Sequence, residues 1–163
     1  MSTILVTGGC GYIGSHTALE LLNKGYDVVV VDNFSNSSFE SLRRVQKITG
    51  KTVTFYEADI RDTETMENIF KAHSFDAVIH FAAFKAVGES VKLPLKYYDN
   101  NISGTVELLK IMDKYGVKKI IFSSSATVYG EPERLPLDEN CRLSTTNPYG
   151  ATKLMMEMIM QDL

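Results

Sequence analysis

Short apolar runs alternate with longer amphipathic segments along most of this chain. Short runs rich in apolar, β-branched and aromatic residues predict a buried strand at residues 3–7 and further strands at 27–32, 52–57, 76–81 and 118–124. Helical periodicity predicts helices at residues 14–24, 38–49, 63–73, 95–115 and 149–163. Apolar strands that are each followed by a helix indicate a parallel sheet covered on both faces. The pattern favours an α/β, doubly wound (Rossmann) fold with about five strands.

Local signals place the ends of several elements. Gly25 and Gly116 are expected to end the helices before them, and Pro94 lies near the start of the long helix at 95–115. Thr63 is expected to be an N-cap, and Asn147-Pro148 leads into the last helix. Residues 130–148 lack any periodic pattern, so we expect a surface loop near the functional site.

The length and composition fit one globular domain over residues 1–163, with 44% hydrophobic residues. A net charge of −3 gives no reason to expect nucleic acid or an anionic membrane as partner. The apolar runs are far too short to span a bilayer. The N-terminus passes directly into a predicted strand, so we expect no signal peptide. Two cysteines make no disulfide framework, which favours free thiols in a reducing cytoplasm; no metal site is expected.

The end of the chain falls inside or just after a predicted helix. A fold of this type usually continues for at least one more strand. We therefore expect the chain to be the front part of a larger protein, truncated before the last strands of its sheet.

The first strand runs into a glycine-rich segment, TGGCGYIGSH. Gly9-x-Gly11-x-x-Gly14 matches the dinucleotide fingerprint, and Gly8-x-x-Gly11-x-x-Gly14 matches a variant with three-residue spacing. Such glycines allow a tight turn, close approach of a pyrophosphate to the backbone, and close packing of the following helix on the sheet. The phosphates then lie at the helix N-terminus. The alternative is a loop that only turns the chain.

Acidic and small residues follow the other strands. Asp32 ends the second strand, where a carboxylate would accept hydrogen bonds from the adenosine ribose and repel a 2′-phosphate, which favours NAD over NADP. Asp59-Ile60 follows the third strand and could reach the adenine, although Asp59 could equally cap the next helix. Phe81-Ala82-Ala83 ends the fourth strand, where small residues would let a cofactor lie against the backbone.

Tyr149 and Lys153 are four residues apart at the start of the last helix and so share one face. A free phenol ionises near pH 10, and a neighbouring ammonium makes a phenolate easier to form. A serine of the run 123–125, at the end of the fifth strand, could donate a hydrogen bond to an oxygen being oxidised. Tyr115 and Lys119 share the spacing, but Gly116 should keep them apart. The alternative for Tyr149 is an ordinary helix-start aromatic residue.

These residues resemble the extended short-chain dehydrogenase/reductase family. The resemblance covers essentially all 163 residues and rests on VTGGCGYIGSHT, VDNFSNSS, ADIRD, VIHFAAFKAVGES, YYDNNISGT, FSSSATVYGE and NPYGATK, in that order. It implies cofactor contacts from Gly8, Gly11, Tyr12, Ile13, Gly14, Asp32, Asn33, Asn36, Ser37, Asp59, Ile60, Phe81, Ala82, Ala83, Lys85, Asn100, Ser125, Tyr149 and Lys153. It implies that the catalytic residues are Tyr149, Lys153 and Ser125, and that Lys85, Ser125 and Tyr149 contact the substrate.

The activity that the resemblance implies is the interconversion of UDP-glucose and UDP-galactose at C4, through a transient 4-keto sugar with tightly bound NAD. Sugar-nucleotide 4,6-dehydratases carry an Asp-Glu pair where this chain has Ala126 and Thr127, which cannot transfer protons. Two alternatives stay open. The substrate could be an N-acetylated hexosamine or a uronic acid, or the chain could be a non-catalytic NAD-binding module.

Family members are about twice as long, and their remaining part supplies most of the sugar-nucleotide site. We therefore expect this chain alone to bind little of the UDP group and to be inactive or nearly so. In the family, dimers form through the helices that correspond to 95–115 and 149–163. The run MMEMIM at 155–160 suggests such a homodimer, unless those methionines face the chain's own core.

Overall fold

The computed structural model describes residues 2–163. Five parallel strands form one sheet in the order β3-β2-β1-β4-β5, with parallel pairing throughout. The strands are β1 (Thr3–Thr7), β2 (Asp27–Asp32), β3 (Thr54–Glu57), β4 (Ala77–His80) and β5 (Ile120–Phe122). The expected fold class and all five strands are confirmed, with β3, β4 and β5 shorter at their ends than predicted.

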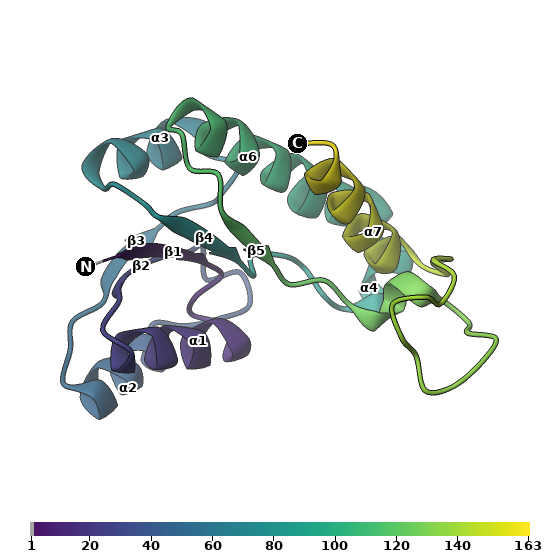
Figure 1. Ribbon diagram of the computed structural model, residues 1–163, viewed down its shortest axis with the longest axis horizontal. Coiled ribbons are helices and arrows are strands. Elements are labelled where there is room, and N and C mark those ends of the chain that lie inside the picture. Colours follow the sequence, from purple (N-terminus) through teal and green to yellow (C-terminus); the bar gives the residue numbers. More distant parts are fainter. Residues whose placement is uncertain (1) are drawn as a thin grey trace. The chain divides into compact units, whose positions relative to one another are not determined.

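Helices cover both faces of this sheet, as Figure 1 shows. One face carries α1 (Tyr12–Asn23) and α2 (Glu40–Thr49), and the other carries α3 (Thr63–Ala72) and α6 (Gly104–Lys114). Successive β1 side chains enter different cores: Leu5 packs with residues of α3 and α6, and Ile4 and Val6 pack with residues of α1 and α2. Burial on both faces explains the continuous apolar runs inside β1 and β2, whereas β3 and β5 contain no buried residue.

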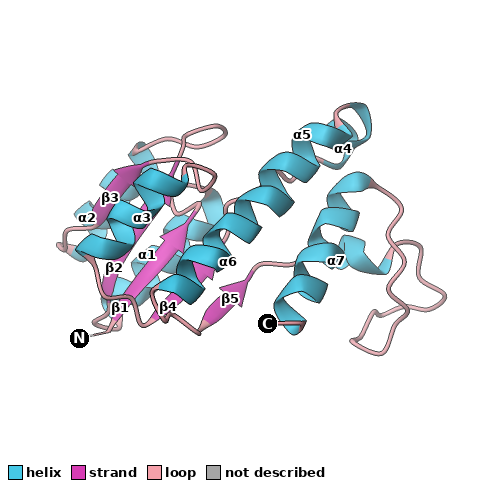
Figure 2. Cartoon of the chain, turned by 90° about the horizontal axis from the view of Figure 1, so that it is seen from above, coloured by secondary structure: helices cyan, strands magenta, loops and turns pink. Residues whose placement is uncertain are grey.

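The chain divides into two compact units. The first runs up to Ala82 and includes Val106–Ser123, so it holds the sheet and most of its covering helices. The second comprises Ala83–Thr105 and Ser124–Leu163. Its elements are α4 (Val87–Lys92), α5 (Pro94–Tyr97), the π-helix η1 (Tyr98–Ser103), the 3₁₀-helix η2 (Ala126–Tyr129) and α7 (Pro148–Gln161). Figure 2 labels α4, α5 and α7 and shows the long loop before α7.

Several details differ from the sequence prediction. The N-cap of α3 is Asp62, not Thr63, because the Asp62 carboxylate accepts a hydrogen bond from the Thr65 amide at 3.1 Å. The single helix expected at 95–115 is an unbroken succession of α5, η1 and α6. Helices α4 and η2 were not predicted. Gly25 and Gly116 have positive φ angles of 86° and 72° after α1 and α6, which fits their expected role as helix ends.

Two kinds of feature are absent from the described residues 2–163. None of the helices there is long and apolar enough to cross a membrane. No group of three or more His, Cys, Asp or Glu side chains in the same range is arranged to hold a metal ion.

Candidate functional site

The sheet reverses its strand order between β1 and β4, and there the glycine loop begins. In doubly wound folds ligands bind at this switch point, outside the carboxyl ends of the strands. Gly8 follows β1 with a φ of 68°, and a Cβ on it would lie 2.7 Å from the Ala82 nitrogen. The Phe81 amide donates to the Thr7 carbonyl at 3.0 Å. The backbone after β1 therefore lies directly against the backbone after β4, and only glycine fits at position 8.

The loop also fits a pyrophosphate at the start of α1. A Cβ on Gly14 would lie 2.4 Å from the Gly8 carbonyl oxygen, so glycine is needed to bring the helix against the loop. Gly11 is the N-cap of α1, and no side chain of the described residues caps the first turn by a hydrogen bond. Tyr12 and Ile13 are 76% and 56% exposed. The first turn thus presents backbone N–H groups and the positive end of a twelve-residue helix to the surface, as an anion site requires.

Asp32 lies at the carboxyl end of β2, where it is buried and accepts three hydrogen bonds within the first unit. One carboxylate oxygen accepts the Cys10 amide at 2.9 Å, which ties β2 to the glycine loop. The other accepts the Phe34 amide at 2.9 Å and the Ser37 hydroxyl at 2.6 Å. The structure therefore brings two of the predicted ribose-binding residues, Asp32 and Ser37, into contact.

Asn33 and Asp59 join the ends of β2 and β3 through a hydrogen bond of 2.9 Å. Arg61 binds both oxygens of Asp59, at 2.9 and 2.8 Å, and lowers the pKa of that carboxyl to about 2. Asp59 does not cap α3, since Asp62 does. The Ile60 side chain is buried with residues of the core under α3 and α6, and so any contact with a base would come from its backbone.

Cys10, inside the glycine loop, is buried. Burial, with a smaller contribution from the charge of Asp32, raises the pKa of its thiol to about 12. The thiol stays protonated near neutral pH, so Cys10 acts as a small core residue rather than a reactive one.

Tyr149 and Lys153 stand on the first turns of α7 in the second unit. The Lys153 ammonium lies 5.9 Å from the centre of the Tyr149 ring, as i, i+4 spacing predicts. Lys153 is 3% exposed, and burial lowers its pKa to about 8, while the charge of Glu157 acts in the opposite direction. The structure thus places a desolvated ammonium beside a phenol, an arrangement that favours a phenolate.

Ser125 belongs to the turn that opens η2, and its hydroxyl oxygen accepts two hydrogen bonds from Thr127. The Thr127 amide donates at 3.2 Å and the Thr127 hydroxyl at 2.9 Å. With both lone pairs used, the Ser125 hydrogen is available for donation to a ligand. A Cβ on Gly150 would lie 2.9 Å from the Thr127 carbonyl oxygen, so this glycine lets η2 pack closely on the first turn of α7.

Asn101, which sequence reasoning missed, links three segments of the second unit. Its side chain accepts from the Phe84 amide at 2.8 Å and from the Asn100 amide group at 2.9 Å. It donates to the Phe84 carbonyl at 3.0 Å and to the Thr152 hydroxyl at 3.1 Å. Thr152 in turn donates to the Tyr149 carbonyl at 2.7 Å. The two adjacent asparagines in YYDNNISGT were the only sign in the sequence that this residue matters. The structure shows that Asn101 is the one that links the three segments.

Three further predicted residues differ in exposure. Lys85 and Asn36 are exposed, and Ala83 is half-buried. Such positions are open to a ligand, but their placement by itself assigns them no role.

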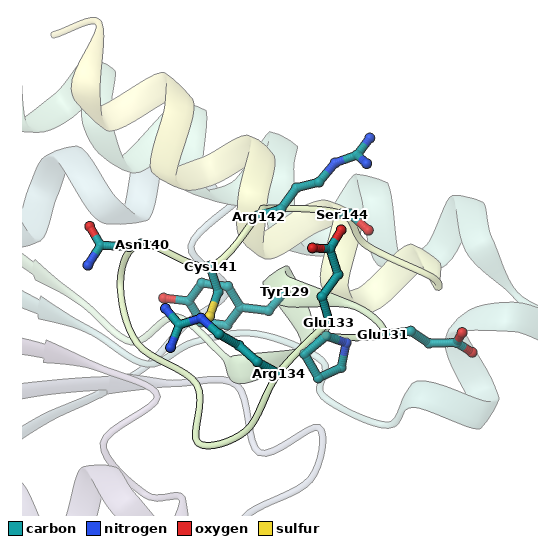
Figure 3. A pocket seen from close by; sticks show the side chains of 9 residues that line it. Tyr129, Glu131, Glu133, Arg134, Asn140, Cys141, Arg142 and Ser144 are labelled. Atoms are coloured by element: carbon teal, nitrogen blue, oxygen red, sulfur yellow. The ribbon is translucent and has the colours of Figure 1, made fainter.

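A pocket of ≈ 280 Å³ lies in the loop between η2 and α7 (Figure 3). Arg134 is held there by Asp138, with both carboxylate oxygens 2.7 Å from one guanidinium nitrogen. None of the site residues predicted within the described chain lines the pocket, which is formed by Tyr129, Glu131, Pro132, Glu133, Arg134, Asn140, Cys141, Arg142 and Ser144.

Comparison with known proteins gives consistent matches. A family model described as GDP-mannose 4,6 dehydratase matches residues 5–163. The chain is 64% identical over 160 residues to the UDP-glucose 4-epimerase of Bacillus subtilis (strain 168), a match that covers 98% of this chain and 47% of that relative. The chain therefore spans about half the length of the curated relatives it matches.

Solved structures agree with the sequence match. The UDP-glucose 4-epimerase of Bifidobacterium longum, in complex with NAD⁺ and UDP, superposes with a TM-score of 0.97 at 58% identity and covers 99% of this chain and 48% of that one. The UDP-Glc/GlcNAc 4-epimerase of Campylobacter jejuni gives a TM-score of 0.94 at 40% identity, covering 99% and 49%.

Proposed function

Because this chain belongs to the GDP-mannose 4,6 dehydratase family and is similar to UDP-glucose 4-epimerases along its length, we propose that it carries the cofactor-binding and catalytic residues of an enzyme that interconverts UDP-glucose and UDP-galactose. The observation that most supports this proposal is the buried Lys153 ammonium beside the Tyr149 ring. A phenol prepared for proton removal, in a chain with a dinucleotide loop, is suited to oxidation of an alcohol.

NAD is the cofactor in this proposal, held by the residues that follow the strands. Gly8, Gly11 and Gly14 leave space for the pyrophosphate, with Tyr12 and Ile13 at the first turn of α1. The adenosine half would meet Asp32, Asn33, Asn36, Ser37, Asp59 and Ile60. The other half would meet Phe81, Ala82, Ala83, Lys85, Asn100, Ser125, Tyr149 and Lys153. When bound, NAD would accept a hydride from C4 of the sugar and return it to the opposite face.

The protein's own residues handle the proton. Tyr149 takes the proton of the sugar 4-hydroxyl as the C4–H bond breaks, which leaves a C4 carbonyl. Ser125 donates its hydrogen to that oxygen, and the Lys153 charge stabilises the phenolate of Tyr149. After the keto sugar has turned over, Tyr149 returns the proton to the oxygen, and the product is the C4 epimer. Lys85 helps hold the sugar nucleotide.

The chemistry after oxidation separates this proposal from dehydration, the activity in the family model's description. Removing water from C5 and C6 needs an acid and a base close to the sugar. Ala126 and Thr127, which follow Ser125, supply neither. We therefore favour epimerisation, in which the oxidised sugar is simply reduced again.

Two alternative sugars would keep the same chemistry. The Campylobacter jejuni structure is described as an enzyme for both UDP-Glc and UDP-GlcNAc, so an N-acetylhexosamine substrate is the first alternative. A uronic acid is the second. Assaying all three nucleotide sugars with one preparation discriminates among them.

We further propose that the two units act together as one NAD-binding domain and that the protein forms a homodimer in the cytoplasm through the helices at 95–115 and 149–163. Met155 and Met158 on α7 are 43% and 56% exposed, whereas Met156 is buried. The exposed pair supports an interface, and sedimentation of Met155→Glu against the unchanged protein tests it.

A coupled assay for conversion of UDP-galactose to UDP-glucose, with NAD present, tests the proposed function. It should be run on the complete protein that carries this chain and on residues 1–163 alone. We expect turnover in the former, abolished by Tyr149→Phe, and little or none in the latter, since the chain covers only 47% of the Bacillus subtilis relative. A complete protein that binds NAD but converts no nucleotide sugar would instead be a non-catalytic NAD-binding module.

A further inference from the structure

Helix α4 contains one buried residue, and that residue is a serine. Ser90 is 0% exposed, whereas Val87 and Val91 of the same helix are 40% and 62% exposed. Serines are mostly found at protein surfaces, and a buried hydroxyl needs hydrogen-bond partners. Those partners explain why the position is polar.

The Ser90 hydroxyl binds the backbone of Tyr149. The Tyr149 amide donates to the Ser90 oxygen at 3.2 Å, and the Ser90 hydroxyl donates to the Val87 carbonyl at 2.6 Å. The second bond fixes the rotamer of Ser90, so its lone pairs face α7. Two segments that are 59 residues apart in the chain meet at this bond.

The first turn of α7 shows why this contact matters. Pro148 has no N–H, and the Gly150 amide is satisfied by the Asn147 side chain at 2.8 Å. The Ala151 amide reaches the Asn147 carbonyl at 3.0 Å. The Tyr149 amide is the remaining donor of a helix start, where backbone donors lack intrahelical partners, and Ser90 accepts from it.

Helix α4 is itself held firmly by α5. The Tyr97 hydroxyl accepts from the Ala86 amide at 3.1 Å and donates to Glu89 at 2.7 Å. Lys96 donates to the other Glu89 oxygen at 2.9 Å. Ser90 therefore projects from a fixed segment, which also follows directly after Lys85.

We infer that Ser90 is a positioning residue, which fixes the backbone of Tyr149 through the Tyr149 N–H and so sets where the Tyr149 phenol stands relative to Lys153. This inference rests on the proposed function, because it gives Tyr149 the role of base. Lys153 lies on the same helix, and Tyr97, from α5, is within electrostatic range of Tyr149 and hydrogen-bonded to Glu89. A shift of Tyr149 changes its distances to these groups.

The test compares Ser90→Ala with Ser90→Thr in the complete protein, with Ser103→Ala, an exposed serine of the same unit, as control. Loss of the acceptor should lower kcat by about 10- to 100-fold, as small misplacements of reacting groups do, and leave KM within about twofold. The acidic limb of the kcat–pH profile should move to higher pH, because the phenolate lies less well beside Lys153. Ser90→Thr keeps the hydroxyl and should restore most of kcat.

A second readout is independent of turnover. The pH at which Tyr149 ionises can be followed as the tyrosinate absorbance that Tyr149→Phe removes, and Ser90→Ala should raise it. An unchanged ionisation and an unchanged kcat–pH profile would overturn the inference, as would a kcat loss that only follows the folded fraction. If Ser90→Ala does not fold, Ser90→Cys replaces it, because a thiol fills the same space but accepts hydrogen bonds only weakly. The same changes in kcat, in the kcat–pH profile and in Tyr149 ionisation are then expected of Ser90→Cys. A parent protein without epimerase turnover overturns the proposed function, and the Tyr149 titration still decides on Ser90.

Discussion

Lys153→Met should stabilise the fold near neutral pH while it destroys the proposed activity. The Lys153 ammonium is buried, and burial lowers its pKa from 10.5 to about 8. Holding the charged form in the folded state therefore costs stability. Methionine has a similar length and carries no charge, so it removes this cost and retains most of the packing.

The magnitude follows from proton linkage. A difference of about 2.5 pKa units between folded and unfolded states corresponds to about 3 kcal/mol. Because the folded-state pKa is lowered, the cost is fully present below about pH 8 and disappears as the pH rises towards about 10.5. The free energy of unfolding of Lys153→Met should thus exceed that of the unchanged chain by about 3 kcal/mol near pH 7, and by about 1 kcal/mol near pH 10.

Urea unfolding of both proteins at several pH values measures this difference, and ionisation of other groups cancels in the comparison. Lys47→Met is the control, since Lys47 is exposed on α2, and its effect should stay within about 0.5 kcal/mol at every pH. A Lys153→Met protein that is less stable near pH 7, or whose difference does not vary with pH, would refute the reasoning.

Two further predictions concern the glycine loop. Gly14→Ala should abolish NAD binding measured by calorimetry, because the new Cβ would lie 2.4 Å from the Gly8 carbonyl oxygen. Gly88→Ala is the control, since its Cβ would have nothing within 4 Å, and it should bind NAD like the unchanged chain. Equal NAD affinities for the two variants would contradict this prediction. A thiol reagent should label Cys141 in the native protein and Cys10 only after unfolding, since Cys10 is buried and the pKa of its thiol is raised to about 12. If the two thiols react at the same rate, the glycine loop around Cys10 is open and the prediction is wrong.

The sheet was predictable because burial on both faces leaves a simple signature. Val28, Val29, Val30 and Val31 are all buried, and their unbroken apolar run is visible without any structure. The same holds for the glycine loop, since steric limits at a tight turn exclude other residues. Where one physical requirement dictates the residue type, the sequence is sufficient.

Prediction failed where the choice depended on contacts between distant segments. Helix α4 is short and mostly exposed, so its apolar pattern is weak, and the partner of Ser90 lies far away in the chain. Asp62 and Thr63 are both good N-caps, and only the direction of the Asp62 carboxylate decides between them. Asn101 could not be separated from Asn100, because the π-helix that changes their direction has no sequence periodicity of its own.

The path of the C4 hydrogen tests the central claim, oxidation and reduction at one carbon, most directly. The complete protein should be given UDP-galactose with deuterium at C4, and the UDP-glucose formed should be examined by mass spectrometry and NMR. The account predicts that deuterium stays at C4 of the product, and that Tyr149→Phe forms no product. Loss of deuterium to solvent, or its appearance at another carbon, would contradict a mechanism in which the hydride leaves C4 and returns to it.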